Sequence, residues 1–129
     1  MSHPQSNTVV SDDQPDENVS MTEAFRRFHA KNPHVYDVLV QLAREWKARG
    51  KGPTGIALFY ERARWELSLA LDSDGMFGLS QNHRAFYARA IMLKERDLAG
   101  VFTLKAAPEA DAWAADYAAR LAGVRRSAA

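Results

Sequence analysis

Apolar residues recur at three- and four-residue spacings in several separate segments of this chain, and proline or glycine stands between most of them. Side chains three and four residues apart lie on the same side of an α-helix, so this spacing predicts amphipathic helices. The pattern therefore predicts a mainly α fold of about five helices in one compact domain. The expected helices cover residues 22–32, 33–49, 55–70, 81–93 and 108–123.

Residues that cap or break helices mark the expected boundaries. The Thr22 hydroxyl is expected to cap the first helix, and Ser80 to cap the fourth. Pro33 disfavours the helical conformation in Asn32 but fits the first position of a helix, where its missing N–H costs nothing. Asn32 is thus expected to end the first helix and cap the second, and Pro108 to begin the fifth.

The third expected helix is apolar around most of its circumference. One face carries Phe59, Tyr60 and Ala63, and a second group of large apolar residues widens that face. A helix with this pattern is typically buried, so we expect little of it at the surface. The residues that widen the face are Leu58, Trp65 and Leu69.

The charge of the chain is unevenly distributed. The net charge is +1, but residues 1–20 contain four acidic residues and no Lys or Arg, so the remainder carries +5. Segments that combine charge with few apolar residues cannot form a core. We expect a disordered acidic tail over residues 1–20, a helical core domain over 21–106, and a C-terminal helix over 107–129 that packs on the core or forms a dimer interface.

Several classes of function are excluded by what the sequence lacks. There is no cysteine, no P-loop, no dinucleotide-binding glycine pattern and no nucleophile elbow. The four histidines, His3, His29, His34 and His83, show no metal-ligand spacing. We therefore expect no enzyme, no cofactor and no metal. Because no apolar run is long enough to span a membrane and no signal peptide is present, we expect no membrane partner and a cytoplasmic location.

Two short apolar runs have the composition of strands. Met76, Phe77 and Leu79 precede the fourth helix, and residues 101–104 follow it. Two helices followed by a short β-ribbon is the order of a winged helix-turn-helix. The expected fold is therefore similar to that class, although about ten residues join the third and fourth helices, which is longer than a strict helix-turn-helix turn.

The fourth helix carries the strongest functional signal. Its apolar face is formed by Phe86, Tyr87, Ala90 and Ile91, and Ala85 and Ala88 keep the opposite face small enough for close approach. Asn and Gln can bind adenine, and Arg can bind guanine, in the major groove, and recognition helices present such residues from the first turn. The alternative is an ordinary solvated face. The residues expected to face DNA are Gln81, Asn82, His83, Arg84 and Arg89.

A second group of cations lies at the end of the second helix. These residues favour the helix dipole in that position, and they can also bind phosphates. We expect them to contact the DNA backbone. The residues are Arg44, Lys47, Arg49 and Lys51.

Three segments together resemble a family of small proteins encoded by tailed phages and prophages, many of them from actinobacteria, which are sometimes labelled helix-turn-helix proteins. The segments are AFRRFHAKNPHVYDVLVQLAREWKARG (24–50), GIALFYERARWEL (55–67) and GMFGLSQNHRAFYARAIM (75–92). The resemblance covers roughly residues 22–104. It implies a phage origin and the cytoplasm of a bacterial host, and it carries over no catalytic or binding residue.

Two functions follow as hypotheses. The first is a phage-encoded, winged helix-turn-helix-like regulator that binds double-stranded DNA. The alternative is a non-enzymatic module that binds a host or phage protein and can form a homodimer through residues 109–124. The surface distinguishes them, because a contiguous basic face over the fourth helix favours DNA, and an exposed patch of Trp, Tyr or Met favours a protein partner.

Overall fold

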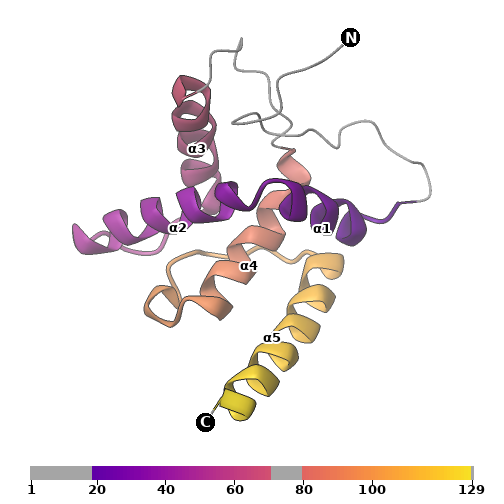
Figure 1. Ribbon diagram of the computed structural model, residues 1–129. Coiled ribbons are helices and arrows are strands. Elements are labelled where there is room, and N and C mark those ends of the chain that lie inside the picture. Colours follow the sequence, from indigo (N-terminus) through magenta and orange to yellow (C-terminus); the bar gives the residue numbers. More distant parts are fainter. Residues whose placement is uncertain (1–18, 71–79, 129) are drawn as a thin grey trace.

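The computed structural model describes residues 19–70 and 80–128 of the chain, and within them the protein is mainly helical (Figure 1). Five α-helices are present among these residues, which confirms the predicted fold class, and two 3₁₀ turns join them. The elements are α1 (Met21–Lys31), α2 (Pro33–Ala48), α3 (Ile56–Ala70), η1 (Gln81–His83), α4 (Arg84–Lys94), η2 (Arg96–Leu98) and α5 (Pro108–Ala128).

The junction between α1 and α2 differs in detail from the sequence prediction. Ser20, and not Thr22, caps α1, because its hydroxyl accepts a hydrogen bond from the Glu23 N–H at 3.1 Å. Pro33 begins α2 as predicted. The Asn32 side chain does not cap α2; it donates to the Phe28 carbonyl at 3.1 Å and is fully buried. It therefore closes the first helix and fixes the bend into the second.

The loop between α2 and α3 turns the chain back onto α2. Gly50 has a φ of 76°, a left-handed conformation that glycine adopts without steric cost just after a helix end. The Trp46 indole N–H then donates to the Gly52 carbonyl at 2.8 Å. The Trp46 ring meets the Phe59 ring edge to face, with the ring centres 5.6 Å apart. The first half of α3 consequently packs on the second half of α2.

Helix α4 is the central element, in contact with α2, α3 and α5. Residues on both of its sides are buried, Ala88 and Arg89 among them. The polar face predicted for this helix is therefore buried in part, at Ala88 and Arg89, whereas Gln81 stays exposed and Arg84 is half-buried. A cluster of aromatic rings joins α4 to α1 and α5. It is formed by Phe25, Phe86, Tyr87 and Trp113.

The predicted β-ribbon is not confirmed. Residues 76, 77 and 79 lie outside the described part of the chain. The segment after η2 instead forms an isolated parallel bridge between Phe102 and Thr54, which precedes α3. The Thr54 N–H donates to the Val101 carbonyl at 3.2 Å, and the Thr103 N–H donates to the Thr54 carbonyl at 2.9 Å. These bonds hold the segment 101–107 against the start of α3.

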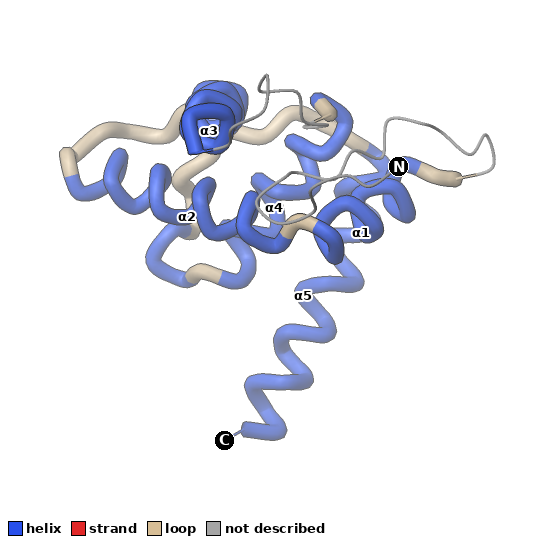
Figure 2. Tube along the Cα trace, turned by 45° about the horizontal axis from the view of Figure 1, so that its top comes forward, coloured by secondary structure: helices blue, strands red, loops and turns tan. Residues whose placement is uncertain are grey.

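Helix α5 is longer than predicted, since it continues through Gly123 to Ala128. A glycine inside a helix costs only about 1 kcal/mol, which the rest of the helix offsets. Ala110 and Trp113 are buried in the first half. Figure 2 shows the second half extending away from the layer that the other helices form, and the Arg125 guanidinium donates to the Leu93 carbonyl at 3.2 Å. The helix thus packs on the core at its beginning.

Candidate functional site

Arg89, one of the residues expected to face DNA, points into the protein. Its side chain is 5% exposed, and its Nε lies 2.7 Å from an Asp111 carboxylate oxygen on α5. Its two terminal nitrogens donate to the Ala85 carbonyl at 2.9 Å and the Lys105 carbonyl at 2.8 Å. Arg89 therefore joins α4, α5 and the segment between them.

The Asp111 carboxylate completes this arrangement. Its second oxygen accepts a hydrogen bond from the Ala107 N–H at 3.1 Å, one turn before it in the chain. That backbone bond, together with the hydrogen bond from Arg89, holds the pKa of Asp111 below its usual value. Asp111 is therefore a charged acceptor at neutral pH, and it fixes both the start of α5 and the orientation of Arg89.

The other residues expected to face DNA lie in η1 and at the start of α4, and they differ in exposure. The Ser80 hydroxyl accepts a hydrogen bond from the Asn82 N–H at 3.2 Å, so Ser80 caps η1, which leads into α4, and not α4 itself as predicted. Gln81 and Asn82 are exposed and Arg84 is half-buried. His83 is buried, with its ring centre 4.8 Å from that of Phe28. The expectation that His83 faces a ligand groove is therefore wrong in this structure, because the 3₁₀ turn directs it into the core.

A cleft brings three of the predicted residues together. It has a volume of about 290 Å³ and lies between the first turn of α3, the beginning of α4 and residues 103–107. We call it the basic cleft, because among the described residues that line it three are cationic and none is acidic. Its polar side chains include Gln81, Arg84, Arg89, Thr103 and Lys105.

Lys105 is the residue of the basic cleft that the sequence analysis missed. It lies in a loop, where no helical periodicity assigns it to a face. Its position depends on the Thr54 bridge, which holds residues 101–103 beside the start of α3. The available signal is its place directly after the predicted strand 101–104, and that signal does not indicate which helix the loop contacts.

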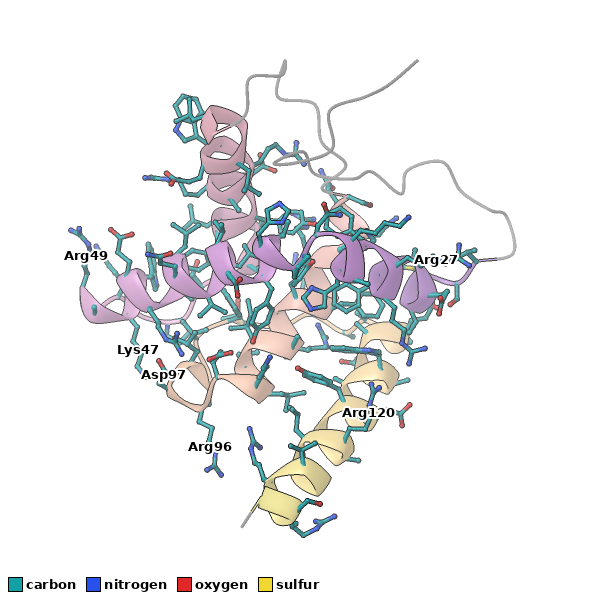
Figure 3. All side chains as sticks on the ribbon, in the orientation of Figure 1. Arg27, Lys47, Arg49, Arg96, Asp97 and Arg120 are labelled. Atoms are coloured by element: carbon teal, nitrogen blue, oxygen red, sulfur yellow. The ribbon has the colours of Figure 1, made fainter. Side chains whose placement is uncertain are left out.

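The four cations expected to contact phosphates lie elsewhere, along the second half of α2 and the loop after it. Arg44 donates to Asp97 at 2.9 Å and to Glu95 at 2.8 Å. The hydrogen bond from Arg44 to Asp97 lowers the pKa of Asp97. The Lys47 ammonium donates to the Asp97 carbonyl. Figure 3 shows Lys47 and Asp97 next to each other, below the end of α2.

The other two members of that group also have neighbours within the chain. Arg49 lies 3.4 Å from Glu45, one helical turn before it. The Lys51 ammonium lies 6.0 Å from the centre of the Trp46 ring, within the range of a cation–π contact. None of the four α2 cations is among the residues that line the basic cleft. The structure therefore places the predicted DNA-binding residues in two separate regions.

Helix α3 carries the largest departure from the sequence analysis. Leu58, Trp65 and Leu69 are 51%, 60% and 68% exposed, so the expectation that this helix is largely buried is wrong. They follow one another at spacings of seven and four residues and therefore lie on one side of the helix. We call these three residues the α3 stripe. In Figure 1 the end of α3 points away from α4 and α5.

A groove adjoins the stripe between α2 and α3. It has a volume of about 470 Å³, and its apolar walls are formed by Leu42, Trp46, Leu58 and Phe59. Charged residues at its margin are Glu45, Arg49, Glu61 and Arg62. We call it the apolar groove. Leu58 belongs to both features, so the apolar groove adjoins the first residue of the α3 stripe, and the exposed Glu61 and Arg62 lie between Leu58 and Trp65.

The described residues contain no group of three His, Cys, Asp or Glu side chains that could hold a metal ion. No helix in residues 19–70 or 80–128 is long and apolar enough to cross a membrane. No protein-family model, curated protein or solved structure matches the chain.

Proposed function

We propose that this protein is a non-enzymatic interaction module, and that it binds an amphipathic helix of a host or phage protein along α3. The observation that carries the proposal is the α3 stripe, with Trp65 exposed at its centre. Large apolar side chains grouped on a surface mark sites of protein interaction, and tryptophan is enriched among the residues that dominate binding energy.

The shape of the surface favours a helix as the partner. An amphipathic helix binds by placing apolar side chains at i, i+3, i+4 and i+7 into a groove. The α3 stripe runs from residue 58 to residue 69, which is roughly 16 Å or three helical turns. The apolar groove lies at one end of the stripe, and it offers Trp46 and Phe59 as walls for one large inserted side chain.

The charges around this surface also favour a protein partner. Each arginine near the stripe has an acidic neighbour: Arg49 lies 3.4 Å from Glu45, and Arg62 lies 3.0 Å from Glu66. Arg64 lies 4.0 Å from Glu61. Such a margin is close to neutral, so it offers little attraction to a polyanion such as DNA. It suits an apolar contact surrounded by polar residues of both signs.

DNA binding by a winged helix-turn-helix stays a prediction from the sequence. Gln81, Asn82 and Arg84 are accessible at the start of α4, whereas His83 and Arg89 are buried. The exposed Trp65 on α3 favours a protein partner, because exposed aromatic side chains are typical of protein-binding surfaces. We therefore treat duplex binding as an alternative outcome of the experiment.

The experiment uses the full chain with a photo-reactive amino acid at position 62, beside the α3 stripe, in a lysate of a bacterial host. We expect a cross-link to one partner, within a peptide whose apolar residues recur at helical spacing. A variant with Trp65→Ser and Leu69→Ser should lose the cross-link. Leu104→Ser is the matched control, since Leu104 is an exposed leucine outside the stripe and should leave the cross-link intact.

Three results would contradict the proposal. The first is a cross-linked peptide from a second copy of this chain, which would make α3 a dimer interface. The second is a cross-link that survives the double substitution. The third comes from fluorescence anisotropy with DNA duplexes across a salt series: steeply salt-dependent binding by both the wild-type protein and the double variant would favour the DNA hypothesis.

A further inference from the structure

We infer that the basic cleft is a second binding site, which takes a small organic anion with an apolar body and one carboxylate or phosphate group. This site lies outside the α3 stripe and the apolar groove, so the inference does not depend on the proposed protein interaction. Its volume of about 290 Å³ suits a ligand the size of a substituted benzene ring.

The electrostatics of the basic cleft favour an anion. Arg84 and Lys105 contribute positive charge from two sides, one from the beginning of α4 and the other from the loop before α5. The carboxylate that pairs with Arg89, that of Asp111, is not among the residues that line the cleft. A ligand oxyanion would therefore meet cations without a competing carboxylate in the wall.

Arg89, the third cation of the basic cleft, is held in position by hydrogen bonds within the protein. Arg89 is 5% exposed, and three hydrogen bonds fix its guanidinium. A side chain fixed in this way loses little conformational entropy when a ligand binds. Charge-assisted hydrogen bonds from such a group are also stronger than neutral ones. Arg89 therefore forms a fixed part of the cleft wall, with its charge paired to Asp111, and the attraction of an anion rests on Arg84 and Lys105.

The backbone adds to the same preference. Gly55, Ile56 and Ala57, at the start of α3, line the basic cleft. The N-terminus of a helix carries partial positive charge from its N–H groups, which favours a nearby anion. This contribution comes from a different element than the side-chain cations, and both act on the same small volume.

The rest of the cleft wall is small and apolar. Ala85, Ala88, Ala106 and Ala107 contribute methyl groups, and Leu104 and Ile56 contribute larger side chains. Ligand sites typically combine such a wall with a few convergent polar groups that orient the ligand. We therefore expect an apolar body to lie on the alanines while its oxyanion points to Arg84 and Lys105.

The experiment is a titration of the isotope-labelled full chain, followed by the amide signals in nuclear magnetic resonance spectra. The probes are phenyl phosphate, benzoate, inorganic phosphate and the neutral benzyl alcohol. We expect phenyl phosphate or benzoate to shift the amides of Ile56, Ala57 and Lys105. Benzyl alcohol and inorganic phosphate should bind at least about tenfold more weakly, since each lacks one half of the recognised chemistry.

The test variant combines Arg84→Gln with Lys105→Gln, which keeps the polar side chains but removes two charges. It should weaken binding of the anionic probe about tenfold or more. Arg62→Gln is the matched control, because Arg62 lies at the apolar groove and should leave the affinity unchanged. Arg89 is left intact, since it joins α4 to α5.

Several outcomes would overturn the inference. Shifts that appear with benzyl alcohol as strongly as with the anions would show a merely apolar site. Equal affinity of the wild-type protein and the double variant would remove the role of the two cations. Amide shifts caused by a DNA duplex but by none of the small anions would assign the cleft to nucleic acid. In each case the cross-linking test of the α3 stripe would keep its own result.

Discussion

The Arg89 guanidinium lies 2.7 Å from the Asp111 carboxylate, and this contact joins a buried arginine of α4 to a half-exposed aspartate of α5. Arg89 was expected at the surface, because it falls on the polar side of its helix. In the folded chain Asp111 of α5 and the Lys105 carbonyl bind Arg89, whereas Gln81 on the same side stays exposed. A residue that resembled a base-reading arginine in the sequence is thus a structural link between two helices.

Replacing Arg89 by leucine should destabilise the protein by about 2–3 kcal/mol. Leucine has an aliphatic stem and a helix propensity similar to those of arginine. It lacks the charge-assisted hydrogen bond to Asp111 and leaves the Lys105 carbonyl without its donor. Chemical denaturation measures the change. Arg126→Leu, on the exposed last turn of α5, is the control and should have little effect. An equal loss in both variants would remove the special role of Arg89.

The stability should fall as the pH drops below about 6.5, in part because of His29. Burial and the nearby Lys94 charge lower the pKa of His29 in the folded protein from its ordinary value of 6.5. Between that value and the lower folded pKa, the unfolded chain binds a proton that the folded protein resists, so unfolding is favoured. Above about pH 7 His29 is neutral in both states and contributes no pH dependence.

The measurement for His29 compares the free energy of unfolding at pH 7.5 and pH 5.5. The wild-type protein should lose more stability between these two conditions than the His29→Gln variant does. Subtracting the loss of the variant from the loss of the wild-type protein cancels the contributions of the other histidines. The same difference in both proteins would show that His29 does not titrate as its burial predicts.

Truncation of two tryptophans should change the free energy of unfolding by very different amounts. Trp113 is 7% exposed and packs against Phe25 and Phe86, so Trp113→Ala should cost about 3–5 kcal/mol. Trp65 is 60% exposed on the α3 stripe, so Trp65→Ala should change the free energy of unfolding by less than about 0.5 kcal/mol. Thermal and chemical unfolding of the two variants test this contrast. A large loss in Trp65→Ala would place that side chain in the core.

Two neighbouring glycines should also differ. Gly50 has a φ of 76°, which costs an alanine about 1–2 kcal/mol, so Gly50→Ala should lower the stability by about that amount. Gly52 has no positive φ and its position leaves room for a methyl group, so Gly52→Ala should have little effect or stabilise slightly. Denaturation curves of the pair suffice, and similar losses in both would contradict the role of Gly50 at the end of α2.

Local features of the fold could be read from the sequence, and the sides of the helices could not. Ser80 and Pro33 mark helix starts through their own chemistry, which depends on a few neighbouring residues. The exposure of Trp65 and the burial of Arg89 depend on which other helices pack nearby. An apolar helix predicts burial only when a partner surface exists, and within residues 19–70 and 80–128 no helix covers the α3 stripe.

The candidate sites show the same division. Gln81 and Arg84 stood out as binding residues because their types and spacing are visible in one segment. Lys105 joins them in the basic cleft only because the bridge from Phe102 to Thr54 brings a distant loop to the start of α3. The sequence predicts that Arg44 binds a phosphate. In the folded chain Arg44 instead pairs with Glu95 and Asp97, which lie about fifty residues later.

The sequence by itself determined the helical class and most helix boundaries, because periodicity, caps and proline act over a few residues. Only the tertiary structure decided which faces are buried, which cations are paired and which apolar residues stay exposed. The physical reason is that burial and ion pairing depend on segments far apart in the chain, such as Arg89 and Asp111, whose meeting follows from the packing of whole helices.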